Sequence, residues 1–370
     1  MTIPQPPRIP SIDQSMQSYI DKHEISGAVT LVADKDKILH LSAVGLQDIE
    51  HNIPMRADSI FWVASMTKLM TATSVMMLEE EGKLSIDDPV AKYIPAFANL
   101  KTHSGKPANL TLRHLITHTS GLAEAPPEKT KVAKTLGELE DAYLDRPTAF
   151  EPGTKWKYCQ SGINTLGHII EIASGQSYAD YVTTHLIQPL GMTDASYYPS
   201  AQQAARLAIS YSIKEGALHA VAIRSLDGHL PTDTNRYAAA NAGLFCTASD
   251  YVRLCQMLLN NGTFQGHEYL KPETVKMMTS NQTDDIPNVG FIPGSNWGLG
   301  FGIVAKPEGV TAMLSPGTFG HSGVYGTQAW TDPVKGRIYI LLLQRGDLKN
   351  SEGSSLRGDF QQAAVDALAN

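Results

Sequence analysis

Hydrophobic and polar positions follow strand-like patterns at both ends of the chain. Residues 27–45, "GAVTLVADKDKILHLSAVG", form two apolar runs around a polar turn, which predicts a β-hairpin. Residues 326–332 and 336–345 form two further strand-like runs, joined by a turn that contains Pro333 and Gly336. These patterns predict one sheet that is assembled from the two ends of the chain.

The middle of the chain has a different periodicity. From about residue 84 to residue 240, helical patterns alternate with loops that are marked by Pro and Gly, as in residues 162–175 and 177–191. Residues 213–236 show neither period and are expected to be irregular.

Strands at both ends with helices between them predict an α/β fold of the α+β type. In this fold, an antiparallel sheet from N- and C-terminal segments is flanked by helices and carries an inserted, mainly helical domain. The expected domains are a discontinuous sheet domain of residues 1–83 and 241–370 and a helical domain of residues 84–240. The active site is expected between them.

Composition excludes some classes of function. Of the 370 residues, 42% are hydrophobic and 18% are charged, as in ordinary globular proteins. The formal net charge of −7, without a basic run, argues against a nucleic-acid partner. No apolar stretch approaches the roughly 18–20 residues that span a bilayer. Cys159, Cys246 and Cys255 lack paired spacing, so neither a disulfide framework nor a zinc site is expected.

The N-terminal residues 1–14 are rich in proline and lack the basic and apolar regions of a signal peptide. This segment fits a cytoplasmic protein and fits equally a mature domain without its leader. The sequence does not separate these two compartments.

The first candidate for catalysis lies in residues 61–68, "FWVASMTK", which precede a long predicted helix. Ser65 and Lys68 are three residues apart and share one face of a helix, so the lysine amine can reach the serine hydroxyl. A helix N-terminus favours a developing alkoxide, and apolar neighbours weaken the preference of a lysine for its charged form. In the alternative interpretation, Ser65 caps the helix and Lys68 is a solvated first-turn residue.

Two further motifs suggest other chemistry. Residues 320–326, "GHSGVYG", resemble a Gly-x-Ser-x-Gly elbow, but Val324 replaces the last glycine and no strand–turn–helix pattern follows. Ser322 is therefore not expected to be a nucleophile. His114 and His118 have the spacing of two metal ligands on a helix, yet no glutamate or third ligand accompanies them. Structural roles are expected for both histidines.

Six stretches in a fixed order carry a resemblance to one family. They are "SMTK", "LTLRHLITHTSGL", "FEPGTKWKYCQSGINTLGHIIE", "AGLFCTASDYVRLCQMLLNNG", "WGLGFGI" and "GHSGVYGT". Together they resemble the serine β-lactamase-like superfamily, most closely the branch of class C β-lactamases, DD-peptidases, D-amino-acid peptidases and β-lactamase-like esterases. The resemblance extends from Ile12 to the C-terminal helical segment and implies a β-lactamase/transpeptidase-like fold.

The resemblance implies three catalytic elements. The first is Ser65 with Lys68. The second is a Tyr-x-Asn triad, which falls on Tyr158-Cys159-Gln160. The third is a Lys/His-Thr/Ser-Gly triad on an edge strand, which matches His321-Ser322-Gly323.

The same resemblance implies the role of each group. Ser65 attacks a carbonyl and forms an acyl-enzyme, and Lys68 and Tyr158 carry the protons. Tyr158 serves as a base only where positive charge, here that of Lys68, favours the phenolate. The backbone N–H groups of Ser65 and Val324 form the oxyanion hole, and Gly323 lets the substrate come close.

Three positions depart from the family pattern. His321 replaces the lysine of the β-lactamases and offers a weaker anion site; alternatively it only packs beside the site. Gln160 replaces asparagine and is one methylene longer. Cys159 stands where serine is common and is expected to be a small buried residue.

These departures favour a carboxylesterase that acts on small acyl esters over a β-lactamase. A D-amino-acid amidase or peptidase, a weak β-lactamase or DD-peptidase, and a catalytically inactive binding protein with the same fold are the alternatives. The expected partner is a small-molecule ester or amide, without metal or organic cofactor, nucleic acid or membrane span. Loops at residues 123–135 and 213–237 are expected to shape the pocket, and the oligomeric state does not follow from the sequence.

Overall fold

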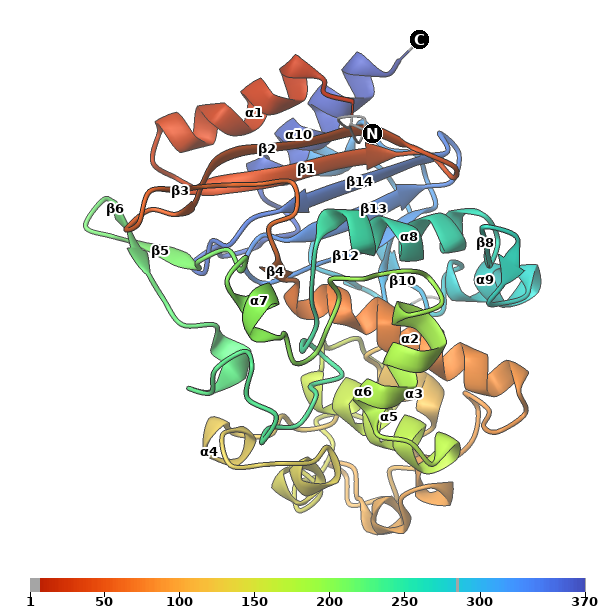
Figure 1. Ribbon diagram of the computed structural model, residues 1–370. Coiled ribbons are helices and arrows are strands. Elements are labelled where there is room, and N and C mark those ends of the chain that lie inside the picture. The colour runs from red at the N-terminus through yellow and green to blue at the C-terminus, as the bar shows by residue number, and fades with distance from the viewer. Residues whose placement is uncertain (1–6, 284–285, 370) are drawn as a thin grey trace.

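An eight-stranded antiparallel sheet forms the centre of the computed structural model, which describes residues 7–283 and 286–369 (Figure 1). The strand order is β10-β11-β12-β13-β14-β1-β2-β3. These strands are β1 (Gly27–Ala33), β2 (Ile38–Asp48), β3 (Ile53–Pro54), β10 (Ser295–Trp297), β11 (Gly302–Val304), β12 (Thr318–Ser322), β13 (Gln328–Asp332) and β14 (Arg337–Leu342). Strand β1 lies beside β14, with Val29 opposite Leu342. The predicted sheet from the two ends of the chain is therefore confirmed, while the first six residues of the proline-rich segment lie outside the described residues.

Helices cover both faces of the sheet (Figure 1). The α-helices are α1 (Pro10–Asp21), α2 (Thr67–Glu80), α3 (Leu112–Ile116), α4 (Pro127–Thr130), α5 (Gln160–Ser174), α6 (Tyr178–Val182), α7 (Ala201–Ala204), α8 (Ala248–Leu259), α9 (Pro272–Met278) and α10 (Ser355–Ala367). Helices α1 and α10 pack together on one face, and α8 packs on the other. Helix α2 lies between the sheet and the helices α5 and α6. None of the helices described has the length and apolar composition that a bilayer crossing requires.

Alternation along β1 explains why this strand is apolar at nearly every position. Ala28 and Val32 belong to the apolar cluster beneath α1 and α10, whereas Val29 and Leu31 belong to the main core on the opposite face. Successive side chains of a strand point to opposite faces, so a strand that is covered on both sides carries apolar residues on both. The buried exception is Thr30, whose hydroxyl lies 2.9 Å from His40 Nε2.

Three short strand pairs lie outside the main sheet in the described part of the chain. They are β4 (Phe61–Trp62) with β7 (Phe245–Cys246), β5 (Tyr211–Lys214) with β6 (Ala217–Ala220), and β8 (Thr263–Phe264) with β9 (His267–Glu268). The β5–β6 hairpin corrects the expectation that residues 213–236 are irregular from their start. The backbone N–H of Tyr211 donates to the carbonyl of Gln344 at 2.9 Å. This part of the segment 84–240 is thus attached to the sheet.

Strands β10, β11 and β12 are not evident from the sequence because they have only three to five residues, and β11 and β12 contain Gly302 and Gly320. Strand β12 lies between β11 and β13, so the expectation that the third triad lies on an edge strand is wrong. The pairing of β12 with β11 ends at Gly320, however. His321 and Ser322 therefore extend beyond β11 and are paired on one side only, with β13.

Candidate active site

Ser65 lies at the junction between β4 and α2. A single 3-10 turn, Ala64–Met66, leads from the strand into the helix, so Ser65 precedes α2 rather than lying within it. Ala64 has a φ of 50°, which is strained for a residue with a side chain. The serine is thus presented on a sharp turn next to the positive N-terminus of α2.

Lys68 lies in the first turn of α2 and is 1% exposed. Its Nζ is 3.1 Å from Ser65 Oγ, 2.9 Å from Gln160 Oε1 and 2.9 Å from the carbonyl oxygen of Asn241. Burial lowers the pKa of Lys68 to about 7, although the negative charge of Glu124 opposes this effect. The alternative interpretation of Lys68 as a solvated residue is therefore wrong.

Gln160 begins α5 and directs its side-chain oxygen at Lys68. Asn241 Nδ2 donates to the same oxygen at 2.8 Å. The carboxylate of Glu124 accepts the backbone N–H groups of Gln160 and Ser161 at 2.7 and 2.9 Å and so caps the helix. Glu124 and Asn241 fix the position of Gln160, and sequence analysis had singled out neither, although Glu124 lies in an expected pocket loop.

Tyr158 stands between Lys68 and His321. Its ring centroid is 4.7 Å from Lys68 Nζ, and its hydroxyl is 3.3 Å from His321 Nε2. Burial raises the pKa of Tyr158, and the negative charges of Glu352 and Glu124 raise it further, against a hydrogen bond with Ser65. The expected phenolate is therefore disfavoured, and Tyr158 keeps its proton.

His321 is an uncharged hydrogen-bond acceptor in this site. Burial lowers the pKa of His321 to about 3, and the positive charge of Lys68 acts in the same direction. His321 Nδ1 lies 2.7 Å from the carbonyl oxygen of Ser322, which can only accept, so the ring proton is assigned to Nδ1. Nε2 then accepts from the Tyr158 hydroxyl.

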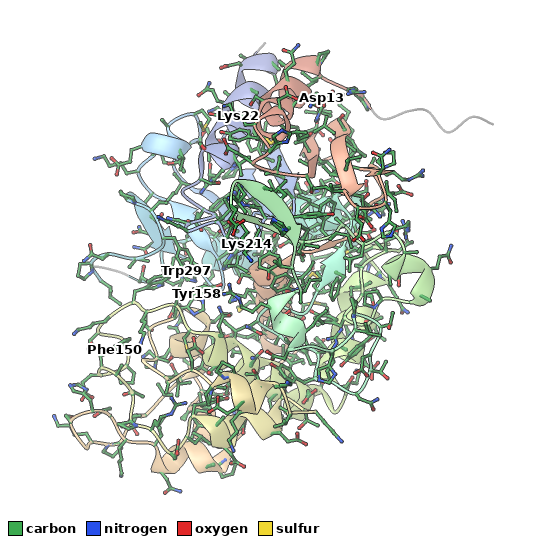
Figure 2. The ribbon with its side chains drawn as sticks, turned by 90° about the vertical axis from the view of Figure 1, so that its left-hand side faces the viewer. Asp13, Lys22, Phe150, Tyr158, Lys214 and Trp297 are labelled. Atoms are coloured by element: carbon green, nitrogen blue, oxygen red, sulfur yellow. The ribbon has the colours of Figure 1, made fainter. Side chains whose placement is uncertain are left out.

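Aromatic rings enclose Tyr158, and Trp297 lies close to it (Figure 2). Ring centroids between 4.4 and 6.2 Å from that of Tyr158 belong to His118, Trp156, Phe291, Trp297 and His321. His118 Nδ1 accepts the backbone N–H of the buried Cys159 at 3.1 Å, whereas His114 forms a capping box with Thr111 at the start of α3. Both histidines thus have structural contacts, and no three His, Cys, Asp or Glu residues within 7–283 and 286–369 are placed to hold a metal ion.

The end of β12 closes against the turn that carries Ser65. A Cβ atom on Gly323 would lie 2.6 Å from the carbonyl oxygen of Val63 and 3.1 Å from Ala64 Cβ, so only glycine allows this approach. Within the described chain, the backbone N–H groups of Ser65 and Val324 donate to no other protein atom. Two donors therefore remain free beside the serine hydroxyl.

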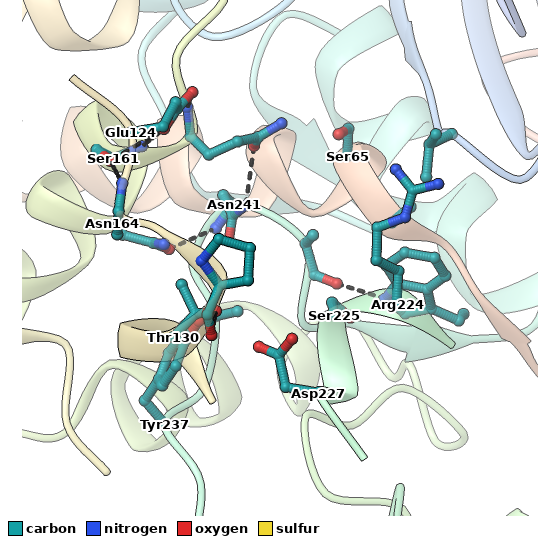
Figure 3. Close-up of a pocket in the computed structure, with 18 residues that line it drawn as sticks. Ser65, Glu124, Thr130, Ser161, Asn164, Arg224, Ser225, Asp227, Tyr237 and Asn241 are labelled. Carbon is teal, nitrogen blue, oxygen red and sulfur yellow. Dashed lines mark hydrogen bonds between the residues drawn. The ribbon is translucent and has the colours of Figure 1, made fainter. Parts of the chain in front are cut away.

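Two cavities meet at Ser65, and both are also lined by Gln160 and Val324. The Arg224 pocket, of about 410 Å³, is further lined by Glu124, Thr130, Arg224, Asp227 and Tyr237 (Figure 3). The Glu352 pocket, of about 330 Å³, is further lined by Tyr158, Phe291, His321, Ser322, Lys349 and Glu352. Loops 123–135 and 213–237 line the Arg224 pocket as expected, whereas no sequence pattern indicated that residues 348–352 line the other.

Comparisons with known proteins cover nearly the whole chain. The Beta-lactamase family model matches residues 12–363. Relatives include the Esterase EstB of Burkholderia gladioli, 30% identical over 364 residues (90% of this chain and 89% of the relative). Protein Rv1367c of Mycobacterium tuberculosis (strain ATCC 25618 / H37Rv) is 31% identical over 375 residues (93% and 92%). A solved structure described as "EstCE1, a hydrolase with promiscuous acyltransferase activity" has the same fold, with a TM-score of 0.81, 23% identity and 98% coverage of both chains.

Proposed function

Because the chain belongs to the beta-lactamase family of serine hydrolases, we propose that it is a carboxylesterase that hydrolyses small acyl esters through an acyl-enzyme on Ser65. One observation carries this proposal: the buried amine of Lys68 lies 3.1 Å from Ser65 Oγ, and burial lowers its pKa to about 7. An amine of this kind is half deprotonated near neutral pH and can accept the serine proton. We further propose that the active site lies between the sheet domain of residues 1–83 and 241–370 and the helical domain of residues 84–240.

In the proposed reaction, Lys68 takes the hydroxyl proton as Ser65 attacks the ester carbonyl. The oxyanion of the tetrahedral intermediate accepts hydrogen bonds from the backbone N–H groups of Ser65 and Val324. The bond to the alcohol oxygen then breaks, Tyr158 gives its proton to the leaving alkoxide, and the proton on Lys68 replaces it. Water hydrolyses the acyl-enzyme by the reverse sequence.

The Glu352 pocket supports an ester in preference to a β-lactam or a peptide with a free carboxylate. His321 carries no positive charge near neutral pH, because burial lowers its pKa to about 3. Of the described residues that line this pocket, the only cationic side chain is Lys349, which is exposed. Similarity to the esterase EstB supports the same substrate class.

An amidase or peptidase that acts on D-amino-acid derivatives is the second candidate. The side-chain amides of Gln160 and Asn241 lie together beside Lys68, at 2.8 Å from one another. They offer hydrogen-bond partners to a peptide group in the cleft. A slow β-lactamase and an inactive binding protein are weaker alternatives, since the groups for proton transfer are in place.

The test is the initial rate on p-nitrophenyl butyrate for the wild type and for a folded Ser65→Ala variant. We expect turnover that the variant loses, and labelling of the peptide that contains Ser65 by a fluorophosphonate. A wild type that is labelled but leaves the ester intact would favour the amidase, to be assayed with D-amino-acid amides. Equal turnover by both proteins would remove Ser65 as the nucleophile.

A further inference from the structure

Glu352 places a carboxyl group in the wall of the Glu352 pocket. The residue is 2% exposed, and Ser322 Oγ donates to its Oε2 at 3.3 Å. Its other oxygen, Oε1, is buried and accepts no hydrogen bond from any described residue. A buried carboxylate oxygen without a donor would favour positive charge nearby, because the interior screens its charge poorly.

Arg357 is a buried positive charge that favours the ionised form of Glu352. This arginine is 1% exposed, its guanidinium lies 3.7 Å from the ring centroid of Trp330, and its Nη1 donates to the backbone carbonyl of Glu352 at 3.0 Å. A guanidinium stays protonated in proteins, and Glu352 is the one acidic group found to stabilise its charge. Burial raises the pKa of Glu352 and outweighs the opposing effects of Arg357 and the Ser322 hydroxyl. Glu352 lines the pocket and Arg357 does not, so Glu352 is the closer of the two groups to a substrate.

No other buried charge in the pocket compensates Glu352. His321 is neutral, Ser322 already directs its hydroxyl to the carboxylate, and Lys349 is exposed. The negative charge of Glu352 also reaches the reacting groups, because it raises the pKa of Tyr158. A substrate carboxylate in this pocket would therefore face a buried like charge, which water screens poorly.

We propose that Glu352 is a specificity-determining residue that makes this pocket accept a cationic substituent of the ester and reject a carboxylate. The inference rests on the proposed ester hydrolysis at Ser65.

The experiment compares kcat/KM for three thioesters that differ in the charge of the thiol part: S-butyrylthiocholine, S-butyryl-2-mercaptoethanol and S-butyrylthioglycolate. A second series varies the acyl part, with p-nitrophenyl esters of 4-(trimethylammonio)butyrate, butyrate and succinate. In the series whose variable part occupies the Glu352 pocket, wild type should prefer the cation. Glu352→Gln should lower the ratio of cationic to anionic rates by about 10- to 100-fold, as Coulomb's law gives for partly desolvated charges.

Three matched variants separate charge from structure. Glu352→Asp keeps the charge and should keep the preference. The double variant Glu352→Gln/Arg357→Gln removes both buried charges and replaces Glu352→Gln if that single variant fails to fold. It should lose the preference for the cation to the same extent as Glu352→Gln. Lys349→Gln removes the exposed cation at the same pocket and should change the ratio by less than about threefold.

Two results would overturn the inference: a charge ratio that no Glu352 variant changes in either series, and a neutral rate that falls as much as the charged rates. Hydrolysis of the neutral esters, and its loss in Ser65→Ala, tests the proposed function separately. If no ester is hydrolysed, calorimetric binding of the charged esters to Ser65→Ala and Ser65→Ala/Glu352→Gln still gives the charge ratio. An unchanged ratio there would equally reject the role of Glu352.

Discussion

The Arg224 pocket and the Glu352 pocket share Ser65 but hold their charges differently. Arg224 is exposed, and its guanidinium has no hydrogen bond or ion pair with any described residue. Glu352 is buried, accepts from Ser322 and is backed by Arg357. Salt and water screen an exposed charge over a Debye length of about 8–10 Å, whereas a buried charge is screened much less. The exposed charge of Arg224 should therefore discriminate between charged substrates less strongly than the buried charge of Glu352.

Lys68 contacts Ser65, which lines both pockets. Its removal should therefore lower the rate for substrates of every charge equally. Lys68→Met should lower kcat by about 10³-fold or more, because it removes the base. Lys68→Arg is the matched control: it keeps a cation but cannot lose its proton, and it should be equally inactive. Steady-state rates on the three thioesters measure this. A loss confined to one charge class would show that Lys68 binds substrate rather than moving a proton.

Tyr158 lines only the Glu352 pocket, yet its proposed task is common to all substrates. Tyr158→Phe should lower kcat by about 10²- to 10³-fold with little change in KM, because it removes the proton donor to the leaving group. Tyr143→Phe is the control, since that buried hydroxyl bonds to Thr165 at 2.7 Å and lines neither pocket. A raised KM at constant kcat would instead make Tyr158 a binding residue.

The pH dependence should be the same for both pockets. The pKa of Lys68 is lowered to about 7, so the free base that the reaction needs is lost as the pH falls below 7. kcat/KM on the neutral thioester should therefore be half-maximal near pH 7 and fall about tenfold per pH unit below it. His321, with a pKa lowered to about 3, does not titrate in this window. A midpoint near pH 10 would contradict the buried, neutral lysine.

Sequence reasoning found the parts of this site that are close together along the chain. Ser65 and Lys68 are one helical turn apart, and the motifs at 158–160 and 321–323 are contiguous stretches, so they could be matched to the family pattern. Glu124, Arg224, Asn241 and Glu352 come from separate loops that only the tertiary fold brings to Ser65. No local period marks such residues.

Protonation states were the other part that the sequence could not indicate. The family resemblance implied that Tyr158 serves as a base where the charge of Lys68 favours the phenolate. The shift in its pKa has the opposite direction, because burial outweighs the neighbouring groups. Burial depends on the packing of five other rings around Tyr158, and all but that of Trp156 come from distant parts of the chain.

Of the substitutions predicted to change activity, Arg224→Gln should have the smallest effect. It tests whether the exposed charge of the Arg224 pocket selects substrates at all. An ester has an acyl part and an alcohol part, and each pocket would hold one of them. The substrate series whose variable part lies outside the Glu352 pocket should therefore respond to Arg224→Gln. In that series the anionic member should lose about threefold in kcat/KM at low salt, as for other exposed charge pairs, and the neutral member should not change. Lys214→Gln, at an exposed cation outside both pockets, is the control.

Salt then separates the two charges in one measurement. At about 0.5 M NaCl the effect of Arg224→Gln should vanish, because the Debye length falls to a few ångströms, while the effect of Glu352→Gln should persist. If both effects vanish together, Glu352 acts as a solvated charge and its burial does not matter for selection. If neither vanishes, Arg224 is shielded when substrate is bound, and loops 123–135 and 213–237 must close over it during turnover.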